Sequence, residues 1–231
     1  MICLKNLCFK ANRREILSEL SLRVKPGEFV VITGPNGSGK STFAKIIAGL
    51  ERQSSGQIIL DGEDISKLPI TERAKKGIAF SFQQPVHFKG LTVRDLLQIA
   101  VTGQETFLDP GVIDFVGLLA EVGLDESYLD REIDKSLSGG ELKRVEIASA
   151  LARPAKLLIF DEPEAGIDIW SFDRLVKVFQ KLRKRNCAII VISHQKRLMA
   201  QADRIVVLKD GRIAKSGPAD KMVAELEREE A

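Results

Sequence analysis

The 231-residue chain has no apolar run long enough to cross a membrane. Its longest pure aliphatic runs, such as residues 188–192, fall far short of the ~18 residues that a membrane-spanning helix needs. Residues 1–6 show no basic region followed by a long apolar stretch, so we expect no export signal. With 44% hydrophobic and 29% charged residues, the composition is that of a soluble globular chain. These observations exclude membrane-spanning, secreted, collagenous and disordered proteins.

The chain also has little net charge, few cysteines and few histidines. Thirty-five Lys and Arg against 32 Asp and Glu leave a net charge of +3, too small a field to indicate nucleic-acid binding by itself. The three cysteines (Cys3, Cys8 and Cys187) are unpaired in spacing, which argues against a disulfide framework or a zinc site and favours a reducing cytoplasm. Only two histidines are present, so a mechanism that needs a histidine cluster is excluded.

The first third of the chain predicts strands that lead into one helix. Residues 16–24 alternate apolar and polar side chains, as in a half-buried strand, and residues 25–28 form a Pro-Gly turn. Residues 29–32 are wholly apolar and mostly β-branched, which is typical of a strand buried on both faces. Residues 42–50 then place their apolar side chains on one helical face.

The middle of the chain has a helical pattern instead. Between residues 92 and 129, apolar side chains recur with a period near 3.6. We expect Asp109 and Pro110 to begin the second helix of this region and Gly123 to end it. The region is therefore predicted to be a helical lobe inserted into an α/β core.

After the lobe, the strand and helix pattern of the core returns. A charged helix with an apolar stripe is predicted for residues 220–230. Strands are predicted at residues 157–160, 188–192 and 203–208. Because strands alternate with helices, we predict an α/β fold with a mostly parallel sheet covered on both sides.

A glycine-rich loop after the first buried strand fits the phosphate-loop pattern G-x-x-x-x-G-K-[ST]. Glycines let successive backbone N–H groups point at an anion, and the following helix adds its positive end. Lys40 is expected to reach the β- and γ-phosphates, and the Ser41 hydroxyl to ligate Mg²⁺. The loop consists of Gly34, Pro35, Asn36, Gly37, Ser38, Gly39, Lys40, Ser41 and Thr42.

Two acids follow the apolar strand at residues 157–160, at the sheet edge where α/β proteins place their ligands. Asp161 is expected to hold the Mg²⁺ shell, and Glu162 to polarise an attacking water as a general base. An acidic strand end alone could equally be solvated surface. Joined to the phosphate loop, it indicates nucleotide hydrolysis.

A third motif, Leu137-Ser138-Gly139-Gly140-Glu141, precedes a predicted helix. Taken alone, it is also a flexible turn with a serine cap. As a second anion cradle, its glycines would expose N–H groups beside a helix N-terminus. One chain seldom needs two cradles for one triphosphate, so two copies packed head to tail would each complete the other's site.

These residues together resemble the ATPase subunits of the ABC superfamily over nearly the whole chain. The phosphate loop resembles Walker A, the strand ending in Asp161 and Glu162 resembles Walker B, and Leu137 to Glu141 resembles the signature motif, which here ends in Glu instead of Gln. Because the signature is the family's second ATP contact, Ser138, Gly139, Gly140 and Glu141 join the expected ATP-binding residues.

The resemblance also implies roles for three other positions. Gln83 stands where the family has its Q-loop, which contacts Mg²⁺ and links the helical lobe to the site; Gln84 is the alternative. His194 resembles the switch histidine that contacts the γ-phosphate. Asp168, at the end of Ala165-Gly166-Ile167-Asp168, matches the family's D-loop, whose other residues here depart from the usual pattern. Glu162, His194, Gln83 and Asp168 are thus the expected catalytic set.

The resemblance implies a P-loop NTPase fold, with residues 1–231 as one ABC ATPase domain. The α/β core would comprise residues 1–83 and 136–231 and carry an N-terminal antiparallel β subdomain, and residues 84–135 would form the helical lobe. ATP and Mg²⁺ are the implied cofactors. The implied assembly is an ATP-dependent head-to-tail homodimer with composite sites, and a different ATPase chain is the alternative closing partner.

Three local features resemble the SUF iron–sulfur cluster assembly ATPases, the SufC group. They are the phrase Phe82-Gln83-Gln84-Pro85-Val86, the phrase Gly166-Ile167-Asp168-Ile169, and Ala11 at the position where many family members stack an aromatic ring on adenine. The resemblance implies soluble partners of the SufB and SufD type. Because the cysteines are scattered, this chain would be the motor and the cluster would sit on a partner.

A membrane permease is the alternative partner. Pro163 after Asp161 and Glu162 is common in transporter subunits, and such a subunit would lie peripherally on the inner face of the membrane instead of free in the cytoplasm. A non-enzymatic ATP-gated clamp is a further alternative, against which the intact Gln83, Glu162 and His194 argue. The basic residues between 177 and 185 are expected to be a solvated helix face, so we expect no direct nucleic-acid contact.

Overall fold

The computed structural model describes residues 1–84, 86–102, 113–167 and 169–230. Two sequence expectations lie outside this part: the helix start at Asp109 and Pro110, and the D-loop residue Asp168. Within the described part, no helix is both long and apolar enough to span a bilayer.

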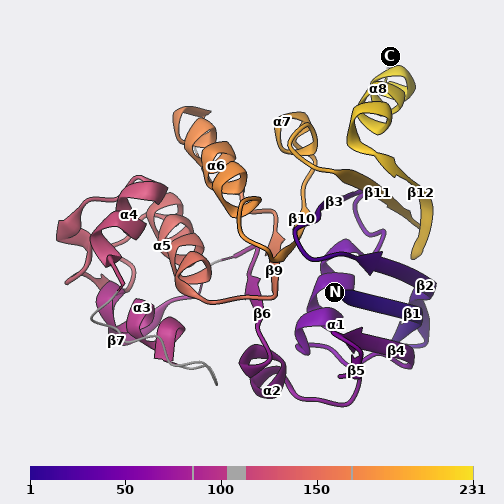
Figure 1. Ribbon diagram of the computed structural model, residues 1–231, viewed down its shortest axis with the longest axis horizontal. Helices are drawn as coiled ribbons and strands as arrows, with labels where there is room; N and C mark the ends of the chain where they lie inside the picture. The colour runs from indigo at the N-terminus through magenta and orange to yellow at the C-terminus, as the bar shows by residue number, and fades with distance from the viewer. Residues whose placement is uncertain (85, 103–112, 168, 231) are drawn as a thin grey trace.

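The helices alternate with strands for most of the chain (Figure 1). The strands are β1 (Ile2–Ala11), β2 (Arg14–Val24), β3 (Phe29–Thr33), β4 (Ser55–Leu60), β5 (Glu63–Asp64), β6 (Ile78–Ser81), β7 (Phe88–Thr92), β8 (Glu132–Ile133), β9 (Leu157–Asp161), β10 (Ala188–Ile192), β11 (Arg204–Lys209) and β12 (Arg212–Pro218). The helices are α1 (Lys40–Ala48), α2 (Ile70–Lys75), α3 (Val93–Thr102), α4 (Phe115–Val122), the 3-10 turn η2 (Glu126–Tyr128), α5 (Gly139–Ala152), α6 (Ile169–Leu182), α7 (Lys196–Met199) and α8 (Ala219–Glu230).

The large sheet has the order β12-β11-β3-β10-β9-β6. Its pairings are parallel from β11 to β6, and only the edge strand β12 runs antiparallel. The predicted mostly parallel α/β sheet is therefore confirmed. The apolar runs at 29–32, 157–160 and 188–192 predicted strands correctly, because each of these strands is buried along its whole length.

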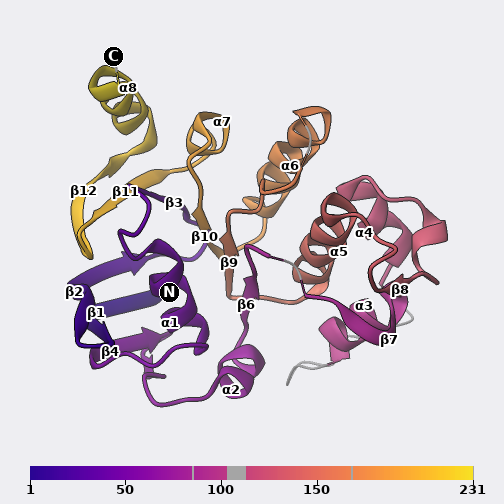
Figure 2. The ribbon, with the colours of Figure 1, turned by 180° about the vertical axis from the view of Figure 1, so that it is seen from behind.

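Each face of this sheet belongs to a different hydrophobic core. Phe29, Phe160 and Val191 point into the core that α5 and α6 cover. Their strand neighbours Val30 and Ile159 point into the core that contains α1 and the β subdomain. Alternation along a strand thus fixes the helical lobe and the β subdomain on opposite sides of one sheet, as Figures 1 and 2 show.

The β subdomain is a four-stranded antiparallel sheet of order β2-β1-β4-β5. Its apolar side chains share the second core with Phe43, Ile46 and Ile47 of α1. The helix that follows the phosphate loop is therefore packed between two sheets. This packing fixes the position of the loop at its N-terminus.

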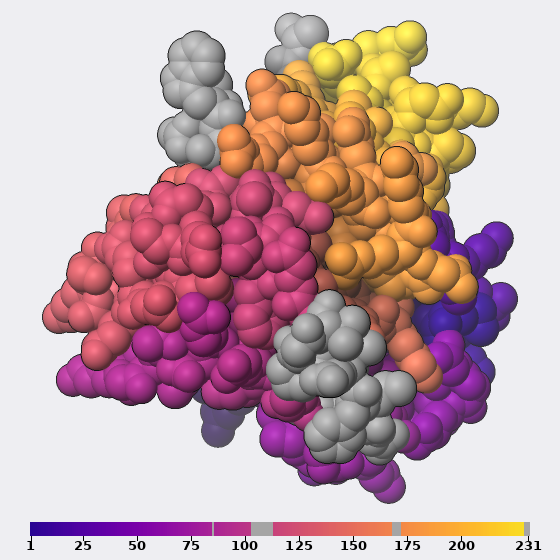
Figure 3. Space-filling view, turned by 60° about the vertical axis from the view of Figure 1, so that its left-hand side comes forward, coloured from indigo at the N-terminus to yellow at the C-terminus, as the bar shows by residue number. Residues whose placement is uncertain are grey.

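The helical lobe contains α3 and α4, and α5, which begins just after it, packs against both of these helices. Figure 3 shows the lobe, magenta to salmon, as a mass beside the orange part of the C-terminal half. Gly123 ends α4 in a left-handed conformation, as predicted, and the N-cap of α4 is Asp114, whose carboxylate accepts from the Gly117 N–H. The short antiparallel pair β7 and β8 was not predicted. The domain boundaries at residues 83 and 136 stay a prediction.

Candidate nucleotide-binding and catalytic site

The phosphate loop joins β3 to α1, and two of its glycines are required by close packing. A Cβ atom on Gly34 would lie 1.9 Å from the Leu208 carbonyl oxygen, and one on Gly39 would lie 2.6 Å from a methyl carbon of Leu17. Both glycines also have positive φ angles, of 135° and 98°. Gly39 caps α1 without any side-chain acceptor, so the first N–H groups of the helix remain available to an anion.

Lys40 lies inside the loop instead of extending into solvent. Its side-chain ammonium donates to the carbonyl oxygens of Gly34 (2.7 Å) and Pro35 (3.0 Å). Burial lowers the pKa of Lys40, and the charges of Glu162 and Asp161 oppose that shift. The neighbouring Ser38 hydroxyl is buried and lacks a partner among the described residues. A cation and an unpaired hydroxyl beside an open helix N-terminus fit a bound phosphate group.

A hydrogen bond joins Ser41, in the first turn of α1, to Asp161, at the end of β9. The Ser41 hydroxyl donates to Asp161 Oδ1 at 3.1 Å, although the two residues are 120 positions apart. Asp161 is 1% exposed, and burial raises the pKa of its carboxyl group while the Ser41 hydrogen bond opposes the rise. Hydroxyl and carboxylate oxygens are the ligands that Mg²⁺ prefers. This pair therefore fits a magnesium ion shared with phosphates.

Gln83 and Glu162 are also brought together. The Gln83 amide donates to Glu162 Oε2 at 2.7 Å, which joins the segment after β6 to the end of β9. Glu162 has a φ of 47°, in the left-handed region, and its N–H donates to the Ile192 carbonyl oxygen at 3.0 Å. Such strain in a non-glycine residue is common at functional sites, where it fixes the direction of the side chain.

His194 follows β10 on the same edge of the sheet. It shares the lining of a cavity of about 640 Å³ with Gly34, Pro35 and Asn36 at the start of the phosphate loop. The pKa of His194 is lowered, first by partial desolvation and then by the positive charge of Lys40. His194 is therefore a neutral imidazole at neutral pH, able to donate one hydrogen bond and accept another.

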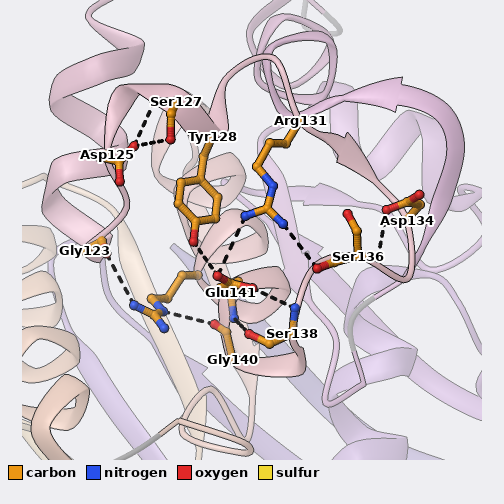
Figure 4. Close-up of polar contacts among 11 residues, drawn as sticks. Gly123, Asp125, Ser127, Tyr128, Arg131, Asp134, Ser136, Ser138, Gly140 and Glu141 are labelled. Carbon is orange, nitrogen blue, oxygen red and sulfur yellow. Dashed lines mark hydrogen bonds and ion pairs between the residues drawn. The ribbon is translucent and has the colours of Figure 1, made fainter.

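Ser138, Gly139, Gly140 and Glu141 lie at the N-terminus of α5. Figure 4 shows Ser138, Gly140 and Glu141. Ser138 and Glu141 form a capping box, in which each side chain accepts from the other's backbone N–H. A Cβ atom on Gly140 would lie 3.0 Å from the Gly166 carbonyl oxygen, which places the motif against the turn after Glu162. Within the described ranges, no hydrogen bond or ion pair joins these four residues to the phosphate loop.

Glu164, a further acidic residue of this site, was not identified from the sequence. It is partly buried, and its carboxylate accepts at 2.5 Å from the hydroxyl of Ser193, the residue before His194. Burial raises the pKa of Glu164, and its other carboxylate oxygen has no partner in the described part of the chain. The signal in the sequence that could have identified Glu164 is its position, as a third acid soon after Asp161 and Glu162 in the chain.

An ion pair behind Gln83, in which the lysine is fully buried, was also missed in the sequence. Lys143 and Glu146 of α5 lie 3.4 Å apart, and the Lys143 side chain is 0% exposed. Lys143 donates to the carbonyl oxygen of Phe82, and Glu146 accepts from the Phe82 N–H. The two charged side chains therefore fix the backbone of Phe82, the residue that precedes Gln83. Two opposite charges three positions apart on a helix look like ordinary surface residues in a sequence, which is why they were missed.

Comparison with known proteins agrees with this geometry. The family profile described as ABC transporter matches residues 17–165. The chain is 40% identical to the uncharacterised ABC transporter ATP-binding protein MJ0035 of Methanocaldococcus jannaschii, over 88% of this chain and 83% of that protein. It is 36% identical to the probable ATP-dependent transporter ycf16 of Trieres chinensis, over 97% of this chain and 93% of that protein.

A solved structure matches the fold over almost its whole length. It is a dimeric post-hydrolysis state of the ATP-binding cassette MJ0796 with bound ADP and phosphate, with a TM-score of 0.83 and 27% identity, covering 95% of this chain and 99% of that one. The family profile spans more than half of the chain, and the relatives exceed 30% identity. This chain belongs to the ABC transporter ATPase family and is an ATPase that uses Mg-ATP.

Proposed function

We propose that two copies of this chain close head to tail around Mg-ATP and hydrolyse it at two composite sites. One observation carries this proposal: the anion-binding features occur at two separate helix N-termini, α1 and α5. A single triphosphate bound at α1 would leave the second cradle without a ligand. In a head-to-tail pair, Ser138 to Glu141 of one copy would cover the ATP held by the other copy. The dimeric MJ0796 cassette supports this arrangement.

The chemistry is assigned to residues that the structure brings together. Lys40 would bind the β- and γ-phosphates, and the N–H groups of residues 34–42 would surround them. Ser41, Asp161 and Gln83 would hold Mg²⁺, which would supply charge neutralisation at the phosphates. Glu162 would polarise the attacking water as general base, since its carboxylate is fixed by the Gln83 amide.

His194 and Asp168 complete the proposed catalytic set. A neutral imidazole at His194 would donate to the γ-phosphate without adding a charge that must later be released. Asp168 would belong to the turn that meets the second copy, and this role rests on the sequence motif. Loss of the γ-phosphate would remove the group that both copies grip, so the pair would open.

An apolar groove beside Gln83 is the proposed docking site for the moving partner. It has a volume of about 340 Å³ and lies between the α2–β6 region and the helical lobe, with Phe80, Phe82 and Leu96 among its walls. Ile70, Val86 and Phe88 at this groove are 40%, 44% and 40% exposed. Exposed apolar side chains around a groove suit one apolar helix or loop of a partner protein.

The favoured partner is a soluble scaffold of the SUF type, with SufB- and SufD-like subunits, and the chain would then act in the cytoplasm. The local sequence phrases around Gln83 and Gly166 support this choice, as does Ala11, which offers no aromatic ring for adenine. A membrane permease is the second candidate. The name of MJ0035, which describes it as an ABC transporter ATP-binding protein, favours it, whereas the ycf16 relatives support the SUF-type partner.

Affinity capture from native cell extract tests the partner directly. We expect soluble cluster-scaffold proteins to be recovered without detergent, and Phe88→Ser to lose them because the groove loses an apolar wall. Ile99→Ser is the matched control, since Ile99 is 49% exposed on α3 and lies outside the groove lining. A multi-span membrane protein recovered only with detergent would establish the permease alternative instead.

A further inference from the structure

The signature motif carries a negative charge at the place where the family commonly has a neutral glutamine. Glu141 is the third residue of α5, and the N-terminus of this helix is the second anion cradle of the proposed site. A carboxylate within a few ångströms of an incoming phosphate would repel it strongly in a partly dehydrated interface. Our inference rests on the proposed composite site and concerns the groups that compensate the Glu141 charge.

Two side chains from the preceding turn of the lobe hold the Glu141 carboxylate. The Tyr128 hydroxyl donates to Glu141 Oε1, and the Arg131 guanidinium lies 3.9 Å from the same oxygen. Figure 4 shows both side chains directed at Glu141. Arg131 is itself fixed, because it donates to the Ser136 carbonyl oxygen and stands 4.7 Å from the centre of the Tyr128 ring.

The remaining oxygen of Glu141 is held by the signature motif itself. Glu141 Oε2 accepts from the Ser138 N–H at 2.7 Å. The Tyr128 hydrogen bond first, and the Ser138 contacts after it, lower the pKa of Glu141 to about 2. The carboxylate is thus ionised at neutral pH, and each of its oxygens already has a donor.

The outcome is a cradle that stays open at Gly139, with the Glu141 side chain held to one side. The Ser138 hydroxyl oxygen accepts from the Glu141 N–H at 3.3 Å, and the same hydroxyl interacts with the Glu141 carboxylate. A Cβ atom on Gly139 would find no atom within 4 Å, which means that the backbone there faces open space. On the far side, Arg144 fixes the Gly140 carbonyl oxygen at 3.1 Å.

We propose that Tyr128 and Arg131 are positioning residues of the composite ATP site. They hold the Glu141 carboxylate against the lobe and balance its charge, so that Ser138 and Gly139 can receive the γ-phosphate of ATP bound to a second copy. Both residues lie outside the recognised motifs. They act through Glu141 and touch no phosphate themselves.

The test separates binding within one copy from closure between copies. In a Glu162→Gln background, the dimer dissociation constant in Mg-ATP is measured by sedimentation for Tyr128→Phe, with and without Glu141→Gln. Mg-ADP affinity, measured by calorimetry, reports the phosphate loop alone because ADP lacks the γ-phosphate. Ser127→Ala is the matched control, since Ser127 belongs to the same turn but pairs with Asp125.

We expect Tyr128→Phe to weaken the dimer about ten-fold or more while Mg-ADP affinity stays the same, since a hydrogen bond to a charged group is lost in each copy. Adding Glu141→Gln should restore most of the dimer, because a neutral amide needs no balancing charge. An unchanged dissociation constant, or no restoration by Gln, would overturn the role of Tyr128. Failure of the Glu162→Gln chain itself to dimerise would overturn the composite site and this role with it.

Discussion

At the scale of single residues, the site depends on side chains held in place before ATP arrives. The Lys40 ammonium is already fixed on two loop carbonyl oxygens, and Ser41 already touches Asp161. Glu162 is oriented both by its left-handed backbone and by the Gln83 amide. Such preorganisation lowers the cost of arranging charges during phosphoryl transfer.

The first residue-scale prediction concerns Lys40. We expect Lys40→Ala to weaken Mg-ATP binding by about ten-fold or more, because a charge-assisted contact to the phosphates is lost. Isothermal titration calorimetry measures this affinity. Since Lys40 also closes the loop through its carbonyl contacts, Lys40→Met serves as a bulkier companion variant. Unchanged affinity in both variants would contradict the assigned role.

The second residue-scale prediction concerns acid stability. The pKa of Glu141 is lowered from 4.5 to about 2 in the folded chain. Its ionised contacts therefore stabilise the fold fully above about pH 4.5 and are lost as the pH falls toward 2. We expect the free energy of unfolding of the wild type to exceed that of Glu141→Gln by more at pH 6 than at pH 3. Urea denaturation at both pH values checks this, and a pH-independent difference would be inconsistent with the lowered pKa.

At the scale of elements, α5 connects the two halves of the site. Its N-terminus carries Ser138, and about one to two turns later Lys143 and Glu146 hold both backbone groups of Phe82, directly before Gln83. Burial raises the pKa of Glu146 and lowers that of Lys143, while each charge opposes the shift of the other. A rotation of α5 would therefore be transmitted to Gln83.

This connection gives a stability prediction. Lys143→Met should lower the free energy of unfolding by about 3 kcal/mol, because it leaves the largely buried Glu146 charge without its ion-pair partner. Adding Glu146→Gln should recover most of the loss, since the amide oxygen can still accept from the Phe82 N–H. Chemical denaturation of the single and double variants measures both effects. A double variant as unstable as the single one would show that the charge imbalance is not the cause.

The fold was predictable from sequence wherever burial is continuous or a motif is local. The strands at β3, β9 and β10 are buried at every residue, so their apolar runs identified them. The pair β7 and β8 was missed because β7 is mostly exposed and β8 has only two residues. Short strands without a buried face have no alternation to detect.

In the candidate site too, the features that are local in sequence were predictable and the long-range contacts were not. The phosphate loop, the acids after β9 and the signature motif are contiguous in sequence, so spacing alone identified them. The contacts that hold them are not contiguous: Phe82 and Lys143 are 61 positions apart, and Ser193 and Glu164 are 29 apart. These pairs exist only because the tertiary fold places β6 beside α5 and the end of β10 beside the end of β9. A single sequence carries no periodicity that reports them.

At the scale of the whole molecule, one chain is insufficient to complete the proposed ATP site. The large sheet presents Lys40, Ser41, Asp161, Glu162 and His194 at one edge, while Ser138 to Glu141 lie apart from them, at the N-terminus of α5 beside the lobe. A second copy, related by a two-fold axis, would bring each set against the other's ATP. Closure of the pair would then move both lobes and the groove beside Gln83 where a partner is proposed to dock.

Sedimentation velocity of the Glu162→Gln chain in Mg-ATP tests this central claim most directly. Because Glu162→Gln removes the proposed general base but keeps the ATP contacts, we predict a stable particle of twice the 25.5 kDa monomer mass. Adding Ser138→Arg, which fills the second cradle, should return the sample to monomers. A chain that remains monomeric in saturating Mg-ATP, or a dimer that survives Ser138→Arg unchanged, would contradict the composite site.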